Sequence, residues 1–235
     1  MRDQYAGDIS DLLKFALLRK LAGADRKLGI AWYYAAGDDG DLDGRHLEWR
    51  DDVAWQFLDQ ELHVGLSSLP ERTVAALEQA PIWPQGIAFH REPIPTSAGR
   101  ANWSAQKRIA LADADIVFLD PDNGLGRESK KHATLSEVRH LRRPDRALVF
   151  ITFPGRDLPH KELVVRLHER LALETGAQDI FTLRTTVSIQ TAKGSFVPRT
   201  RWFTILDTDQ QLSERIHAFA NEVARIPRVK ASLES

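Results

Sequence analysis

The residues with the clearest chemical potential form one short segment, Asp120-Pro121-Asp122-Asn123-Gly124. They supply two carboxylates and a carboxamide, followed by a glycine that gives the backbone unusual freedom. The preceding run, Ile116 to Leu119, is short and wholly apolar, which predicts a buried parallel strand. Pro121 cannot continue a central strand and Asn-Gly favours a turn. Because ligands of open α/β sheets bind at the carboxyl ends of strands, we predict an active site at this turn.

A second candidate segment follows the predicted strand 28–34. Residues 35–46 contain three glycines and four aspartates. A turn at Gly37 could bring backbone N–H groups against a cofactor, although the G-x-G-x-x-G pattern is absent. Four acids would repel a phosphate, so acids such as Asp39 suit a ribose hydroxyl, a sulfonium cation or a metal ion. An ordinary solvated acidic loop explains the same composition.

Cations and aromatics near other predicted loops are candidates for contact with an anionic substrate. The segment 126–132 is basic, so it could contact an anionic substrate or form an ordinary solvated loop. Trp103 could stack on a base or pack in the core. His46 beside Arg45 could bind a phosphate, or it could have a structural role. The substrate-binding candidates are His46, Arg100, Trp103, Arg156 and Arg201, with Lys130 and Lys131 beside them.

Predicted strands and helices alternate along the chain. Strands are expected at 28–34, 86–90, 114–119, 147–153, 179–189 and 196–206, and helices at 8–22, 50–62, 70–79, 100–112, 163–173 and 213–225, with a further helix starting at 134 or 136. This order predicts an α/β fold with a doubly wound, mostly parallel Rossmann-like sheet, helices on both faces and a final antiparallel strand. We predict one domain over residues 1–226 and a flexible tail over 227–235.

Composition narrows the class of protein. The 235 residues are 43% hydrophobic, which suits one α/β domain. The formal net charge of -1 gives no global basic field for nucleic acid. The absence of cysteine excludes disulfides, a thiolate nucleophile and Cys-based metal sites. No apolar run approaches the ~20 residues that span a bilayer, and the first residues are polar. We therefore expect a cytoplasmic protein that does not enter membranes.

The segment from Tyr5 to Phe15, Tyr-Ala-Gly-Asp-Ile-Ser-Asp-Leu-Leu-Lys-Phe, resembles the amino terminus of the ribosomal RNA large-subunit adenine-N6 methyltransferase J family. That family carries His-Ala-Gly-Asn and Asp-Val-Leu-Lys-His in this region, followed by a strand and a glycine-rich cofactor loop. Its catalytic tetrapeptide, Asp-Pro-Pro-Tyr, lies after the fourth strand, where this chain has Asp120-Pro121. The likeness covers about the first forty residues and this one motif.

This resemblance implies a class I S-adenosylmethionine-dependent methyltransferase, a class whose sheet also finishes with an antiparallel strand. It implies that Lys14 and Asp120 form the active-site pair, that Gly37 lies in the cofactor loop and that Tyr5 lies near the substrate. Asp122-Asn123 replaces Pro-Tyr, so the aromatic that stacks the target base is missing, and Trp103 or Phe153 would take its place. The combined motifs 43–46, 120–124 and 201–203 are also similar to a group of uncharacterised bacterial proteins, which implies no chemistry.

Three functions fit these residues. The first is methyl transfer from S-adenosylmethionine to an amine of an RNA or DNA base. Asp120 and the Pro121 carbonyl would hold the amine, Asp122 would take its proton and Asn123 would orient the base edge, with no metal required.

The second function is a Mg-dependent phosphoesterase or nuclease. Asp120, Asp122 and Asn123 would bind the ion together with an acid from 38–43. Lys130, Lys131, Arg156 and Arg201 would hold the phosphate. The D-x-D-N-G pattern lacks the glutamate that completes a calcium loop. The third function is a non-enzymatic module on the methyltransferase-like fold that binds RNA, DNA or a protein.

Overall fold

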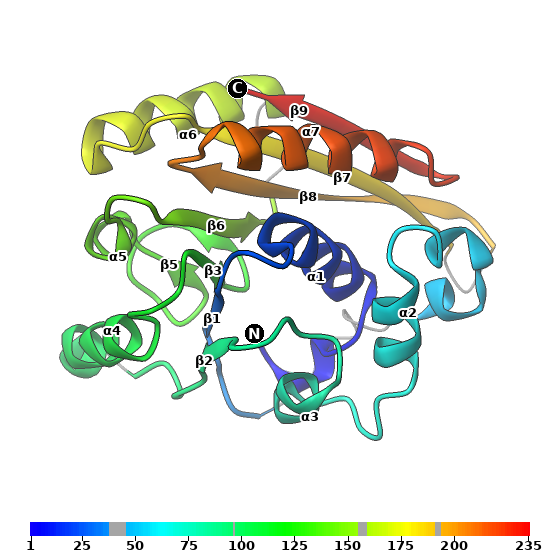
Figure 1. Ribbon diagram of the computed structural model, residues 1–235, viewed down its shortest axis with the longest axis horizontal. Coiled ribbons are helices and arrows are strands. Elements are labelled where there is room, and N and C mark those ends of the chain that lie inside the picture. The colour runs from blue at the N-terminus through cyan, green and yellow to red at the C-terminus, as the bar shows by residue number, and fades with distance from the viewer. Residues whose placement is uncertain (38–45, 96, 155–158, 191–193) are drawn as a thin grey trace.

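The fold is organised around one twisted sheet (Figure 1). The computed structural model describes residues 1–37, 46–95, 97–154, 159–190 and 194–235. Across these residues the sheet has seven strands. In spatial order they are β2 (Ala88–His90), β1 (Leu28–Trp32), β3 (Ile116–Asp120), β6 (Ala147–Thr152), β8 (Phe196–Leu206), β7 (Phe181–Gln190) and β9 (Val229–Glu234).

The strand directions confirm the predicted fold class. β2, β1, β3 and β6 are paired in parallel. β8 is antiparallel to both β6 and β7, so β7 runs in the parallel direction, and β9 is antiparallel to β7. The sheet is therefore a mostly parallel, Rossmann-like α/β sheet, with two antiparallel strands where the sequence predicted one. The carboxyl ends of β1, β3 and β6 meet along one edge, as the prediction of the site required.

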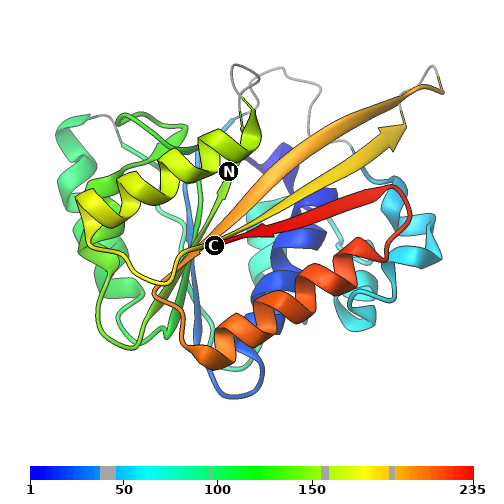
Figure 2. The same cartoon turned by 90° about the horizontal axis from the view of Figure 1, so that it is seen from above.

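Helices cover both faces of the sheet (Figure 2). α1 (Ile9–Ala22) and α7 (Gln210–Ala224) contact each other and bury one apolar face of the sheet. α4 (Ser97–Ala110), α5 (Leu135–Leu141) and α6 (His160–Thr175) bury the other. The shorter elements are α2 (Gln60–Ser67), α3 (Val74–Gln79), β4 (Gly124–Leu125), β5 (His132–Ala133) and the 3-10 helices η1 (Asp3–Tyr5), η2 (Glu48–Asp51) and η3 (Val53–Trp55).

Helix α1 is buried on almost every side. Asp8 caps its amino terminus by accepting hydrogen bonds from the backbone N–H groups of Ser10 (2.8 Å) and Asp11 (3.1 Å). Every residue from Ile9 to Leu18 is buried, including Lys14, so the helix has no solvated face over its first half. Its first turns therefore bring polar side chains into the interior, at the edge of the sheet where β3 ends.

Two sequence predictions about local structure are wrong. The predicted flexible tail instead forms β9, which pairs with the exposed edge of β7, buries Val229 and places Glu234 2.6 Å from Arg184. The predicted helix 50–62 is broken into η2, η3 and the start of α2, because Asp52 and Asp59 each cap a new helical turn.

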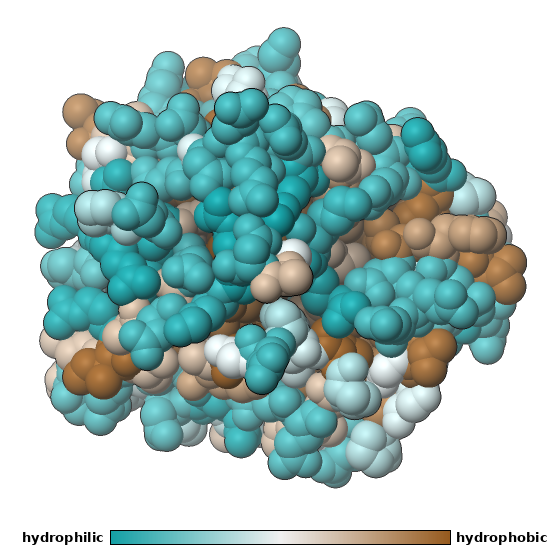
Figure 3. Space-filling model, viewed as in Figure 1, coloured by the Kyte–Doolittle hydropathy of each residue, from teal (hydrophilic) through white to brown (hydrophobic). Residues whose placement is uncertain are grey.

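The surface seen in Figure 3 is largely hydrophilic, with small separated apolar patches. Phe57, Leu173 and Ile109 are the most exposed large apolar side chains, at 89%, 87% and 74%. Across the described residues, none of the helices combines the length and the apolar character needed to cross a membrane.

The turn after β3 requires a glycine at position 124. Gly124 has φ +102°, and a Cβ added there would lie 2.5 Å from Thr152 Oγ1. We expect Gly124→Ala to lower the free energy of unfolding by about 2–5 kcal/mol, because backbone strain and overpacking add.

Gly37→Ala is the matched control for this prediction. Gly37 also has a positive φ, +88°, but its Cβ would meet nothing within 4 Å. Gly37→Ala should lower the free energy of unfolding by about 1–2 kcal/mol, because only backbone strain opposes the new side chain. Urea unfolding of both variants measures the difference, and equal losses would contradict a packing constraint at Gly124.

Candidate functional site

A pocket of about 380 Å³ opens at the carboxyl ends of β3 and β6. Its walls come from the first turns of α1, the turn after β3, the end of β6 and the start of β8. The structure places eight of the predicted site residues on its surface: Tyr5, Lys14, His46, Asp120, Pro121, Asp122, Asn123 and Arg201. Residues from the two ends of the chain are thus brought to one place by the fold.

The centre of the pocket wall is a buried cluster of three charges. Lys14 Nζ donates to both carboxylate oxygens of Asp120, each at 3.0 Å. The same ammonium lies 2.6 Å from Asp11 Oδ1, and Gly7 N donates to Asp11 Oδ2 at 2.7 Å. Asp11, Asp120 and Lys14 are 0%, 3% and 4% exposed. The ammonium therefore links α1 to the end of β3.

The protonation of this cluster differs from that of exposed groups. Burial raises the pKa of Asp11 to about 7, against the attraction of Lys14. Burial alone would lower the pKa of Lys14, but attraction to Asp11 and Asp120 outweighs it and raises that pKa. Lys14 is thus held as a cation, while the charge of Asp11 changes near neutral pH.

Sequence reasoning missed Asp11 as a site residue. The signal was present, because residues three apart on a helix share a face. Asp11 and Lys14 have that spacing. What the sequence could not show is that this face points inward.

The turn itself is tied down on both sides. Asp122 Oδ1 lies 2.6 Å from the amino group of Met1, which also donates to the carbonyl of Tyr33 at 2.6 Å. Asn123 N donates to the carbonyl of Lys131 at 2.9 Å. These contacts fix the backbone of 121–124 against the end of β1 and against the basic segment before β5.

An aromatic ring is present in the pocket, and it is not Trp103. Phe153 directly follows β6, lines the pocket and is 40% exposed. Of the two aromatics considered from sequence for base stacking, Phe153 is the one in a position to do it. Tyr5 lines the same space.

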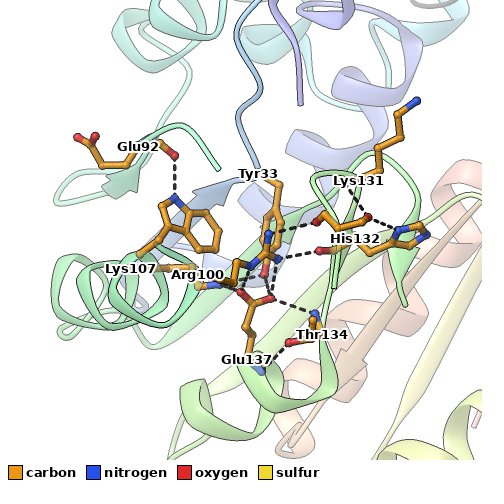
Figure 4. Close-up of polar contacts among 10 residues, drawn as sticks. Tyr33, Glu92, Arg100, Lys107, Lys131, His132, Thr134 and Glu137 are labelled. Carbon is orange, nitrogen blue, oxygen red and sulfur yellow. Dashed lines mark hydrogen bonds and ion pairs between the residues drawn. The ribbon is translucent and has the colours of Figure 1, made fainter. Parts of the chain in front are cut away.

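Arg100 and Trp103 do not line the pocket; they belong to a buried structural network (Figure 4). Arg100 Nε and Nη2 donate to the two carboxylate oxygens of Glu137, at 2.9 and 3.1 Å, and Nη2 also donates to the carbonyl of His132 at 2.8 Å. Trp103 Nε1 donates to the carbonyl of Glu92 at 2.8 Å. Their predicted roles in substrate binding are therefore corrected: both side chains are only 3–5% exposed and already satisfied.

The same network fixes the end of β1. Lys107 Nζ donates to the Tyr33 hydroxyl at 2.9 Å, and that hydroxyl donates to Glu137 Oε2 at 2.9 Å. Burial lowers the pKa of Lys107 to about 8, against the attraction of Glu137. The network holds β1, α4 and α5 together.

Gly37, a further predicted site residue, does not line the pocket. Gly37 is exposed, and its carbonyl accepts a hydrogen bond from Arg2 Nη1 at 2.9 Å. Asp39 and Arg156 lie outside the described residues. The acids 38–43 proposed for a magnesium site lie there too, and within the described part of the chain no group of three or more acidic or histidine residues is placed to hold a metal ion.

Comparison with known proteins identifies a shared fold. No protein-family model and no curated protein matches the chain. Protein LPL1258 from Legionella pneumophila, described with the family model DUF519, is 12% identical over 98% of both chains, with a TM-score of 0.51. An S-adenosylmethionine-dependent methyltransferase from Anabaena variabilis is 12% identical over 86% of this chain and 83% of that chain, with a TM-score of 0.38. The first likeness shows a common fold; the second is too distant to support an argument.

The raised pKa of Asp11 predicts a pH dependence of stability. The folded protein keeps this proton up to about pH 7, whereas the unfolded chain loses it near its ordinary value of 3.8. Stability should therefore fall as pH rises between these values, by as much as about 4 kcal/mol from this group alone. Asp11→Asn should remove that part of the dependence.

Urea unfolding of wild type and Asp11→Asn across this pH range measures the effect. Asn can accept the Gly7 hydrogen bond with its oxygen, but its amide nitrogen then faces the Lys14 ammonium, which lowers stability by a similar amount at every pH. Relative to wild type, the variant should therefore gain stability as pH rises through this range. If the free energies of unfolding of the two proteins differed by the same amount at every pH, the pKa of Asp11 would not be raised.

Proposed function

We propose that this protein transfers a methyl group from S-adenosylmethionine to an amine of a nucleic-acid base in RNA or DNA. The observation that carries the proposal is the Asp120-Pro121 turn, which ends a central parallel strand, faces a pocket and has its carboxylate held by Lys14. It supports the role of active-site pair that the sequence resemblance implies for Lys14 and Asp120.

The residues present suit a sulfonium cofactor in size and charge. The pocket volume of about 380 Å³ lies in the usual range for small-molecule sites. Asp120 and Asp122 are paired with Lys14 and the Met1 amino group, so their end of β3 carries no net positive charge that would repel a sulfonium. Pro121 lines this pocket and would contact the cofactor. The cofactor would supply an electrophilic methyl carbon.

The chain's own residues would align the acceptor. Asp120 and the carbonyl of Pro121 accept hydrogen bonds from the amine, so that its lone pair faces the methyl carbon in line. The nitrogen–carbon bond forms as the sulfur–methyl bond breaks, with the bonding electrons remaining on sulfur. The nitrogen then loses a proton, which Asp122 takes. Lys14 prevents Asp120 from turning away from the amine, because it binds both carboxylate oxygens.

Binding of the base would use the rest of the pocket wall. Asn123 orients the base edge, and Phe153 supplies the stacking surface that the Asp122-Asn123 sequence lacks. Tyr5 and His46 line the same pocket. The aromatic is therefore contributed by the end of β6 in place of the β3 turn.

A non-enzymatic binding module on this fold is the second candidate. The observation that favours it is the presence of Asp122-Asn123 where the resembling family has Pro-Tyr. It differs from methyl transfer in one consequence: loss of the Asp120 carboxylate would leave the function unchanged.

Titration calorimetry with S-adenosylhomocysteine and a methylation assay test the proposal. We expect binding at micromolar ligand and transfer of labelled methyl from S-adenosylmethionine to RNA or single-stranded DNA, located by nucleoside analysis. Asp120→Asn should slow transfer by about 10²–10⁴-fold, because the amide cannot accept from the amine as a carboxylate does.

Asp115→Asn is the matched control. It removes a carboxylate from the opposite end of the same strand, where Asp115 Oδ2 accepts from Lys27 N. This variant should keep full transfer. Absence of heat with S-adenosylhomocysteine at high micromolar concentration would refute the cofactor. Equal transfer by Asp120→Asn and wild type would refute the role of Asp120.

A further inference from the structure

The pocket contains a buried cation whose hydrogen-bonding groups are not used by the fold. Arg201 lies near the start of β8 and lines the pocket, yet it is only 2% exposed. Its Nε and Nη1 are hidden from solvent and have no hydrogen-bond partner among the described residues. Burial lowers the pKa of Arg201 to about 10, although nearby Asp8 opposes this.

The acids of the pocket are already engaged elsewhere. Asp8, whose charge acts on Arg201, directs Oδ1 to the N–H groups of Ser10 and Asp11. Asp11 and Asp120 share the ammonium of Lys14. Asp122 contacts the amino group of Met1. The α1 and β3 side of the pocket therefore leaves Arg201 without a hydrogen-bonded carboxylate among the residues that the structure describes.

A buried guanidinium without such partners is unfavourable unless a ligand supplies the missing hydrogen-bond acceptors. The planar fork of arginine matches the oxygens of a phosphate or carboxylate, which it binds through two parallel hydrogen bonds. Arg199, Lys131 and His160 line the same pocket and add positive potential or donors there. We propose that Arg201 forms a buried oxyanion-binding site that receives the phosphate or carboxylate of a ligand occupying this pocket.

The position of Arg201 in the sheet limits how that ligand lies. β8 neighbours β6, and β6 neighbours β3, so with strands about 4.8 Å apart β8 is about 10 Å from the strand that carries Asp120. It lies on the side of Asp120 away from β1. The ligand must therefore reach from the Asp120 turn to Arg201. Resting on the proposed function, the oxyanion is either the phosphate of the methyl acceptor or the carboxylate of the methionine part of the cofactor.

Two pairs of probes distinguish these sources. Adenosine 5′-monophosphate and adenosine differ in the phosphate; S-adenosylhomocysteine and 5′-methylthioadenosine differ in the amino-acid part that carries the carboxylate. Calorimetric titrations are made with wild type, Arg201→Met and Arg201→Lys. We expect Arg201→Met to weaken the oxyanion-bearing member of one pair by about 10- to 100-fold, and its partner little. Arg201→Lys should have an intermediate affinity for that probe, because lysine keeps the positive charge but lacks the planar guanidinium that makes two parallel hydrogen bonds.

Arg184→Met is the matched control, since Arg184 lies beside Trp202 on the neighbouring strand, outside the pocket, and is paired with Glu234. It should bind all four probes as wild type does. The melting temperature of Arg201→Met should be no lower than that of wild type, because the replaced nitrogens have no partners among the described residues.

Three results would overturn the site: no loss in either pair, equal losses for both members of a pair, or no binding of either oxyanion-bearing probe to wild type. Because these are binding measurements without methyl transfer, they separate this proposal from the proposed function. Phosphate-dependent binding through Arg201 with no methylation would leave the site and reject the enzyme. Methylation by a protein whose ligand binding does not depend on Arg201 would support the enzyme and reject the oxyanion site.

Discussion

The buried contact of Lys14 with Asp11 and Asp120 is the constraint on which the rest of the site depends. One ammonium pairs with a carboxylate on its own helix and with another at the end of a central strand. Removing Lys14 would leave buried carboxylates without their cation, so α1 cannot shift against β3 without a large penalty. Because Asp11 has a pKa near 7, the net charge of this cluster changes with a single proton at neutral pH.

This arrangement divides the pocket electrically. The carboxylates gather on the α1 and β3 walls, whereas Arg199 and Arg201 lie on β8. The acids are balanced within the protein, but Arg201 is not hydrogen-bonded within its described part. A ligand with an anionic group near β8 would complement the wall whose charge the protein leaves without hydrogen bonds. This polarity, more than the fold that the chain shares with LPL1258, is what links the pocket to a particular chemistry.

The sequence predicted features that depend on neighbours in the chain. The apolar run before Asp120, the proline and the Asn-Gly pair are local signals, and the turn they predicted is where β3 ends. Features that depend on distant partners were missed. β9 forms because β7 offers an unpaired edge, and its own sequence, Val-Lys-Ala-Ser-Leu-Glu, is a weak strand signal. The pairing of Lys14 with Asp120 came from resemblance to a family, because the two residues are 106 positions apart in the chain.

Arg100 and Arg201 show why a substrate contact cannot be read from residue type alone. Both are buried arginines, at 5% and 2% exposure, and both were predicted to bind substrate. Arg100 is satisfied by Glu137 and by backbone carbonyls, so the fold itself repays its desolvation. Arg201 has Nε and Nη1 left over among the described residues, so its desolvation is repaid only when something enters the pocket. Unpaired nitrogens on a buried charge that also lines a pocket therefore point to a ligand site, and only a folded structure shows them.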